Sequence, residues 1–259
     1  MVDITAAKPF YSVLVLAFFC SLMVAGAAVG LRPLQEENKT LDRKKNILLA
    51  ANLYDPSKSV QQLFANIETR VVDLSTGKFV PPDTISPQDF DQLKAAASKD
   101  MGLAIPKDED IAGLGRLEKY SLVYLIKKND TVEQIVLPIR GKGLWSTLYG
   151  YIAVKSDLTS VSGISFYEHG ETPGLGGEIT NPRWQAGWED KRIYNQSGEE
   201  VIRVGGKADP KDKIHHVDGL SGATLTTNGV DDLITFWFGD NGFKPFLTRF
   251  KESGGKING

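Results

Sequence analysis

The residues best suited to chemistry lie in three glycine-rich segments in the C-terminal half of the chain. The first runs from Gly141 to Ser146, and the second runs from Glu168 to Gly177. The third, from Asp218 to Thr227, mixes glycine and alanine with serine and threonine. Small residues let a phosphate approach the backbone amides closely, and the N-terminus of a following helix adds partial positive charge. The third segment could therefore hold a phosphate group.

A helix is expected directly after the third segment, and it bears on this interpretation. Asn228 is a suitable N-cap, with Asp231 at the third helical position. Asp231 and Asp232 would compensate part of the helix dipole, which counts against a bound phosphate. A hydroxyl-rich turn that only caps the helix is the alternative. The apolar residues that repeat at i, i+3, i+4 and i+7 are Val230, Leu233, Ile234 and Trp237.

Other kinds of site fit the sequence poorly. Ser221 lacks the glycine two residues later that a nucleophile elbow requires, and no histidine can be assigned as its base. The only cysteine, Cys20, lies in an apolar stretch, so no disulfide or thiolate cluster can form within the chain.

Two groups of residues contain side chains that can bind metals. Glu168, His169 and Glu171 do not have the spacing of a known zinc or iron site. His215 and His216 are adjacent and cannot both face one metal from a regular strand. We expect no metal and no catalytic residue in this chain.

The three segments resemble the signatures of the family of covalently bound FMN domains. The run D-G-L-S-G-A-T from Asp218 to Thr224 resembles the flavinylation sequence of that family, in which the last threonine accepts the phosphate of FMN as a phosphoester. E-T-P-G-L-G-G in the second segment and G-K-G-L-W-S in the first resemble the other two signatures, in the same order. The resemblance implies that Thr224 carries covalent FMN.

The resemblance also implies roles for residues around Thr224. Ser221, Gly222, Ala223, Leu225 and Thr226 would surround the phosphate and ribityl chain. Glu171, Thr172, Leu175 and Gly176 would line the isoalloxazine, with Leu144, Trp145 and Ser146 supplying apolar cover and hydrogen bonds. Lys207 is a further candidate neighbour of the phosphate. The alternatives are core packing for Trp145, a surface carboxylate in a turn for Glu171, and a solvated charge for Lys207.

Among members of that family, the length, the run L-D-R-K-K-N-I-L from Leu41 to Leu48 and the G-L-W-S segment most resemble the C subunits of sodium-translocating NADH:quinone oxidoreductases. The resemblance implies an electron-relay protein, inactive alone, in a bacterial inner-membrane complex that oxidises NADH, reduces quinone and pumps sodium. It implies the other membrane subunits and a flavin transferase, with FAD as donor, as partners. The alternatives are a G subunit of an Rnf-type electron-transport complex and a non-redox membrane-tethered binding or assembly domain.

The N-terminal stretch from Phe10 to Leu31 has no charged residue in 22 positions. As a helix it would be about 33 Å long, which matches the hydrocarbon core of a bilayer. A cleaved signal peptide is the alternative, because Ala25-Gly26-Ala27 resembles a cleavage site. Lysines and arginines after the span favour a cytoplasmic C-terminal domain, but they are mixed with acidic residues. We follow the resemblance, which implies a periplasmic flavin domain.

The rest of the chain predicts an α+β fold in which an N-terminal transmembrane helix precedes an antiparallel-sheet FMN-binding domain with packed helices. Strands are expected at 120–126, 133–139, 148–154 and 161–167, where short apolar runs are rich in β-branched and aromatic residues. A helix near 59–68 and a strand near 70–73 precede them. The expected parts are a tail at 1–9, the span at 10–31, a membrane-proximal helix and cap at 32–115, and the flavin domain at 116–259. A net charge of -2 argues against nucleic-acid binding.

Overall fold

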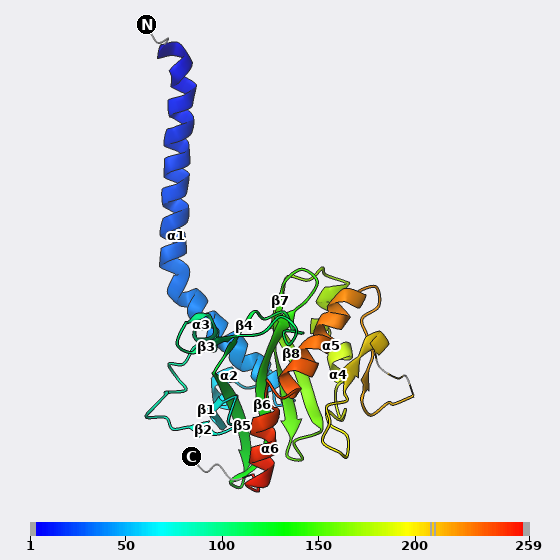
Figure 1. The fold of residues 1–259 in the computed structure, drawn as a ribbon. Coiled ribbons are helices and arrows are strands. Elements are labelled where there is room, and N and C mark those ends of the chain that lie inside the picture. The colour runs from blue at the N-terminus through cyan, green and yellow to red at the C-terminus, as the bar shows by residue number, and fades with distance from the viewer. Residues whose placement is uncertain (1–3, 208, 210, 256–259) are drawn as a thin grey trace. The chain divides into compact units, whose positions relative to one another are not determined.

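The computed structural model describes residues 4–207, 209 and 211–255 (Figure 1). The chain divides into two compact units, residues 1–43 and residues 44–259. The helix α1 (Ile4–Ala50) passes from the first unit into the second. The domain limits expected from the sequence, with a boundary near residue 115, stay a prediction.

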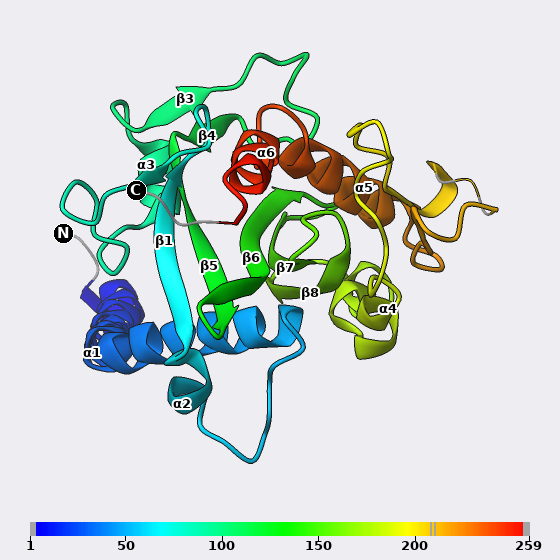
Figure 2. The same cartoon turned by 90° about the horizontal axis from the view of Figure 1, so that it is seen from below.

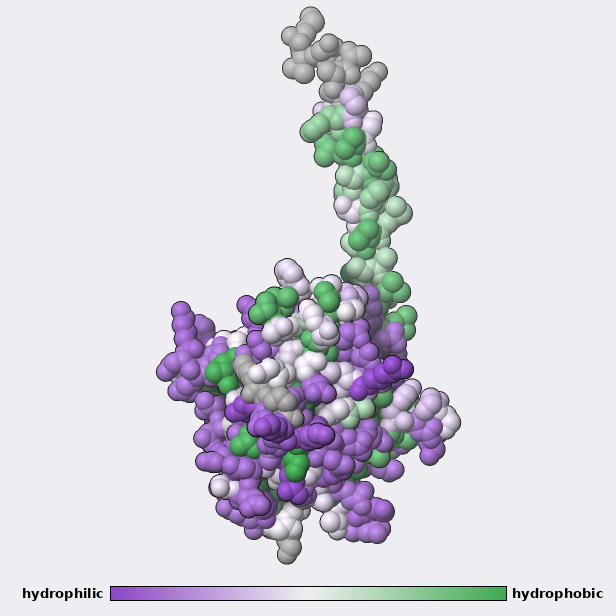
Figure 3. All heavy atoms as spheres, turned by 90° about the vertical axis from the view of Figure 1, so that its right-hand side faces the viewer, coloured by the Kyte–Doolittle hydropathy of each residue, from purple (hydrophilic) through white to green (hydrophobic). Residues whose placement is uncertain are grey.

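The first unit is formed by the N-terminal part of α1. Apolar side chains around this helix are exposed, from 50% for Leu31 to 74% for Val29. They give this part of α1 the mostly apolar surface seen in Figure 3, whereas the surface of the second unit is mostly polar. In the part of the chain that the structure describes, α1 is the one helix that is long and apolar enough to cross a membrane.

The second unit is built on a six-stranded sheet in which all neighbouring strands are antiparallel. The strand order is β2 (Phe79–Val80), β1 (Ile67–Asp73), β5 (Tyr120–Lys128), β6 (Thr131–Lys142), β7 (Thr147–Lys155) and β8 (Val161–Glu168). The four long strands expected from the apolar runs are present, and the α+β class is confirmed. Asn129 and Asp130 join β5 to β6 with φ of 50° and 60°, the positive values that a tight hairpin turn requires.

Helices cover both faces of the sheet (Figure 2). On one face, Ile47 and Leu48 from the end of α1 pack with Tyr124 and Tyr151 of the sheet. On the other face, α5 (Thr224–Phe238) and α6 (Lys244–Glu252) contribute large buried aromatic residues, among them Trp237 and Phe246. Each face therefore has its own apolar core.

The smaller elements lie in the connections between the elements named above. They are α2 (Val60–Phe64), α3 (Gln92–Ala97), β3 (Gly102–Ala104), β4 (Arg116–Glu118), η1 (Gly176–Thr180), α4 (Pro182–Ala186), β9 (Arg203–Val204), η2 (Gly205–Lys207) and β10 (His216–Val217). The helix expected near 59–68 is shorter than predicted. Ser59 and Gln62 begin it with a capping box, but Glu68 already belongs to β1, where it pairs with Leu125 of β5.

The expected start of the last long helix was wrong. Helix α5 begins at Thr224, four residues before Asn228, and its N-cap position is Ala223. Asp231 therefore lies in the second turn, where its carboxylate accepts a hydrogen bond of 2.7 Å from the backbone N–H of Val204. The apolar stripe was predicted correctly, since Val230, Leu233, Ile234 and Trp237 are fully buried.

Candidate functional site

The first glycine-rich segment forms the tip of the β6–β7 hairpin. The ladder between these strands ends at the pair Lys142 and Thr147, which leaves Gly143 to Ser146 as a four-residue loop. The loop is closed by a hydrogen bond of 2.7 Å from the Gly143 N–H to the Ser146 carbonyl. Leu144 and Trp145 are therefore presented at the tip, where they are 42% and 70% exposed.

The second segment begins where β8 ends, at the same end of the sheet. Glu168 pairs with Tyr149 of β7, so the chain that follows runs beside the hairpin loop. The Gly170 N–H donates a hydrogen bond of 2.6 Å to Oγ of Ser146. The third segment runs into α5, and α5 packs against this end of the sheet. Gly229 of α5 lies so close to the hairpin that a Cβ on it would overlap the Lys142 carbonyl oxygen. All three segments thus meet at one end of the sheet.

The carboxylate of Glu171 joins the three segments. Its Oε1 accepts hydrogen bonds from the backbone N–H groups of Trp145 and Ser146, at 2.9 and 3.2 Å. Its Oε2 accepts from the N–H of Leu144 at 3.2 Å and from the hydroxyl of Thr226 at 2.6 Å. Glu171 is 4% exposed, so the interpretation of this residue as a surface carboxylate is wrong.

The electrostatics of Glu171 follow from these contacts. Burial by itself raises the pKa of a carboxyl group. The hydrogen bonds from Thr226 and from the backbone of the hairpin loop outweigh burial and hold the pKa of Glu171 below its ordinary value.

Two glycines leave room for the carboxylate: a Cβ at Gly143 would lie 2.7 Å from Oε1, and a Cβ at Gly176 would overlap the Thr226 hydroxyl. The glycine-rich segments are thus packed tightly around the ionised carboxylate of Glu171.

Thr224 is the first residue of α5, and its side chain is exposed. Ala223 at the N-cap position offers no capping oxygen, and no side chain caps this helix in the described part of the chain. The first turn of α5 contains no acidic residue, so the objection raised by Asp231 and Asp232 no longer applies. An uncapped helix N-terminus presents unpaired backbone N–H groups and partial positive charge, which is a favourable environment for a phosphate.

Exposed apolar side chains come from all three segments that meet here. Leu175 of the second segment is 44% exposed, and Leu225 of the third is 60% exposed. Together with Leu144 and Trp145 they offer apolar surface beside the start of α5. Leu175 also approaches Gly222, whose φ of 71° favours glycine and whose added Cβ would lie 3.2 Å from Leu175 Cδ2. The interpretation of Trp145 as a core residue is wrong, because a residue 70% exposed is not buried in a core.

The sequence-predicted site residues differ in burial. Those with exposed backbone or side chains are Leu144, Trp145, Thr172, Leu175, Ser221, Gly222, Thr224 and Leu225. Those that are buried are Glu171, Gly176, Ala223 and Thr226, while Ser146 is half-buried. The η2 turn that contains Lys207 packs against α5, but the side chain of Lys207 lies outside the described residues. Contact of each of these residues with a flavin stays a prediction.

Three residues that support the site were missed. Gly143 and Gly229 allow the close approach of the hairpin loop to Glu171 and to α5. Thr227 accepts a hydrogen bond of 3.0 Å from the N–H of Leu220, which holds the third segment against its own helix. The adjacent hydroxyls Thr226 and Thr227 were the signal for this, since two threonines side by side at a helix start can bond to two different neighbours.

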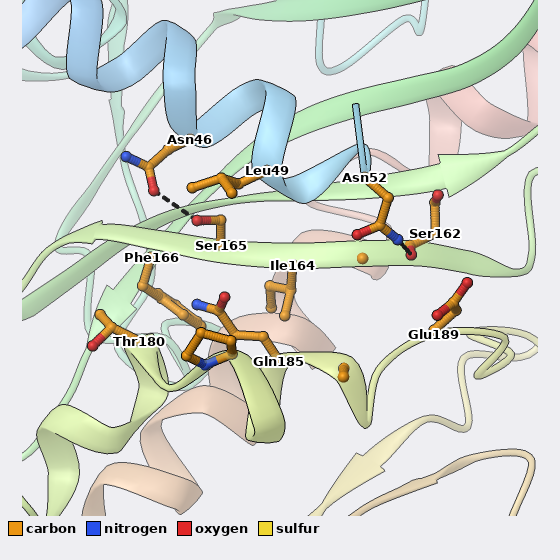
Figure 4. A pocket seen from close by; sticks show the side chains of 13 residues that line it. Asn46, Leu49, Asn52, Ser162, Ile164, Ser165, Phe166, Thr180, Gln185 and Glu189 are labelled. Atoms are coloured by element: carbon orange, nitrogen blue, oxygen red, sulfur yellow. Dashed lines mark hydrogen bonds between the residues drawn. The ribbon is translucent and has the colours of Figure 1, made fainter. Parts of the chain in front are cut away.

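A separate pocket of about 330 Å³ lies at the edge strand β8 (Figure 4). Its walls come from the end of α1, from β8 and from α4. Asn46 accepts a hydrogen bond of 2.6 Å from the Ser165 hydroxyl, and Asn52 donates one of 2.7 Å to the Ser162 carbonyl. None of the residues that line this pocket belongs to the three glycine-rich segments. Its polar contacts tie the end of α1 and the turn that follows it to the sheet edge.

Comparison with known proteins agrees with the geometry. The model of a family described as FMN-binding domain matches residues 143–238. The C subunit of the Na(+)-translocating NADH-quinone reductase of Pseudomonas aeruginosa is 46% identical over 92% of this chain and 94% of its own length. The Yersinia pestis protein of the same name is 44% identical over 95% and 93%. The crystal structure of Shewanella oneidensis NqrC is similar, with a TM-score of 0.73, 34% identity, and coverage of 81% of this chain and 96% of that one.

Proposed function

This chain belongs to the family of C subunits of the Na(+)-translocating NADH-quinone reductases, and we propose that it relays electrons in that complex through one FMN joined to Thr224. Identity of 42–46% to proteins of that name over nearly the whole of both chains is the observation that carries the assignment. The two alternatives from the sequence, an Rnf-type G subunit and a non-redox tethered domain, gain no support from these relatives.

The residues of the site fit an FMN. The uncapped N-terminus of α5 would hold the phosphate, and the proposed acceptor hydroxyl is on the first residue of that helix. Exposed Leu144, Trp145 and Leu175 offer apolar surface for a flat aromatic ring. Bound flavin supplies the capacity to accept and pass on electrons, while the protein sets its position and surroundings. Because the role is relay, no residue of this chain needs to act as a general acid or base on NADH or quinone.

Attachment requires a flavin transferase and FAD. Oγ of Thr224 forms a bond to the phosphorus of the FMN half of FAD, the pyrophosphate P–O bond breaks, AMP leaves with the bridging oxygen, and the hydroxyl proton is released. The exposure of Thr224 leaves its hydroxyl accessible to such an enzyme. A phosphoester on Thr224 would lie at the N-terminus of α5, where the helix dipole is positive.

The function is tested by reconstituting the complex. Co-expression of the remaining reductase subunits, the flavin transferase and this chain should give membranes that transfer electrons from NADH to quinone with sodium stimulation. Omission of this chain alone should abolish that transfer, because the relay between the other redox groups is then missing. Full activity in membranes that lack this chain would contradict the assignment.

We further propose that α1 anchors the chain in the bacterial inner membrane by a single pass, with the flavin domain in the periplasm. Support comes from the exposed apolar surface of α1 and from the resemblance to the family. A reporter that is active only outside the cytoplasm, fused after Gly259, should be active. A cytoplasmic reporter at the same position should be silent, and the reverse pattern would place the flavin domain in the cytoplasm.

A further inference from the structure

Glu171 is hydrogen-bonded to parts of the chain that are far from it in sequence. Its carboxylate lies 26 residues from Trp145 and 55 residues from Thr226, and it is hydrogen-bonded to both. Three of the four backbone N–H groups of the hairpin loop, those of Leu144, Trp145 and Ser146, donate to it. The fourth, that of Gly143, closes the loop itself. Most of the backbone N–H groups of the loop are therefore held by this one side chain.

The same carboxylate also fixes the first turn of α5. Thr226 is 1% exposed and lies two residues after Thr224, so its bond to Glu171 sets where the start of the helix lies relative to the hairpin loop. Gly143 and Gly176 enclose the carboxylate, since a Cβ at either position would crowd one of its oxygens. Glu171 is thus held on several sides by protein atoms, and its four hydrogen bonds use both oxygens.

We propose that Glu171 is the positioning residue of the flavin site, holding the hairpin loop that carries Leu144 and Trp145 at a fixed place relative to Thr224. This inference rests on the proposed FMN site and deepens it. Glu171 acts through the loop amides and Thr226, because its oxygens are already bonded to protein donors. The site is therefore arranged before the flavin arrives, which lowers the ordering cost of binding.

A carboxylate is required for this role. A glutamine at position 171 has the same shape, but one of its two oxygens is replaced by an NH₂ group that donates hydrogen bonds. If the NH₂ group takes the place of Oε1, the amides of Trp145 and Ser146 face a donor. If it takes the place of Oε2, the Leu144 amide faces a donor, while the Thr226 hydroxyl can turn and accept. Glu171→Gln therefore breaks one or two of the four contacts with little change in side-chain volume.

The test uses hydrogen–deuterium exchange on the full-length, flavin-free chain in detergent. In Glu171→Gln, a peptide that covers the hairpin loop should exchange at least about tenfold faster than in wild type, while peptides from β5 should not change. Glu133→Gln, the same charge change on an exposed residue near the other end of β6, is the matched control and should leave loop exchange unchanged. Loop exchange at the wild-type rate in Glu171→Gln would overturn the proposal.

A second pair of variants covers the case in which Glu171→Gln fails to fold. Thr226→Val removes only the hydroxyl that bonds to Glu171, whereas Thr226→Ser keeps a hydroxyl and loses a methyl group. Loop exchange should be at least about threefold faster in Thr226→Val than in Thr226→Ser. Equal exchange in these two variants would overturn the proposal as well.

The link to the flavin is tested separately, by the initial rate at which flavin transferase attaches FMN. Glu171→Gln should slow attachment at least about tenfold. Thr224→Ala should prevent attachment but keep the loop protected from exchange. Attachment at the wild-type rate in Glu171→Gln would overturn the positioning role and leave the proposed function intact. Absence of attachment in wild type would instead overturn the proposed function, while the exchange data would still report the loop contacts.

Discussion

Thr224→Ala should abolish covalent FMN while the protein stays folded. The substitution removes the hydroxyl oxygen that is proposed to carry the phosphate, and Thr224 is exposed at the start of α5, so little packing is lost. Alanine is also a good helix former at this position. When the chain is co-expressed with flavin transferase, the wild-type band should fluoresce in a denaturing gel and the Thr224→Ala band should not.

Two neighbouring hydroxyls are the controls. Ser221→Ala and Thr226→Ala keep the acceptor oxygen and remove other hydroxyls near it, so both should retain at least partial flavinylation. Thr226→Ala should lose more of it, because its hydroxyl is bonded to Glu171 and is buried, whereas Ser221 is exposed. A fluorescent Thr224→Ala band would show that the acceptor is another residue.

Arg140→Leu should cause a large loss of stability. Arg140 is 7% exposed, and its Nη1 lies 2.6 Å from Oε2 of Glu118, which is fully buried. The guanidinium also lies over the Trp237 ring at 5.5 Å. Removal of one partner of a buried ion pair leaves the other charge without compensation, which costs about 3–5 kcal/mol. Thermal unfolding should then occur at least about 6 °C lower for a domain of this size.

This loss should depend on pH. Burial raises the pKa of the Glu118 carboxyl above its ordinary value of 4.5, and Arg140 opposes that rise. Without Arg140 the pKa in the folded state rises further. As the pH rises above about 4.5, Glu118 ionises in the unfolded chain but stays protonated in the folded variant. The free energy of unfolding of the variant therefore falls as the pH rises. The deficit relative to wild type should be larger at pH 8 than at pH 5.

Two controls distinguish the contribution of the buried ion pair to stability from a general effect of removing a positive charge. Lys128→Leu removes a lysine whose ion pair with Glu133 is largely exposed, and it should cost about 1 kcal/mol or less. The double variant with Arg140→Leu and Glu118→Gln removes the unpaired charge and should recover part of the stability. A melting temperature for Arg140→Leu equal to that of Lys128→Leu would show that the buried pair is not needed for stability.

The strands and the last helix face were predictable because their signal is local. Each apolar run of β5 to β8 lies within one strand and has the length and composition of a strand. The apolar stripe of α5 lies within one helix and follows the helical period of 3.6 residues. The start of α5 was missed because Thr224 to Thr227 are mostly β-branched and carry little helix propensity. Side-chain hydrogen bonds hold this start in place: Thr226 donates to the distant Glu171, and Thr227 accepts from the N–H of Leu220 just before the helix.

The site was predicted as a set of residues, but the contacts among them were not. Motif order alone indicated that Glu171, the hairpin loop and Thr224 belong together. The burial of Glu171 depends on a strand pairing, Tyr149 with Glu168, that brings two distant segments side by side. No local pattern distinguishes a carboxylate in a turn from one buried by such a pairing. The exposure of Trp145 follows in the same way from its place at a hairpin tip.

The most direct test of the central claim is peptide mapping by mass spectrometry of the wild-type chain after co-expression with flavin transferase. We expect the peptide that contains the third segment to carry the mass of one FMN less one water, and fragmentation to place that mass on Thr224. Flavin mass on Thr226 or Thr227, or a chain that carries no covalent flavin after exposure to active transferase and FAD, would contradict the account.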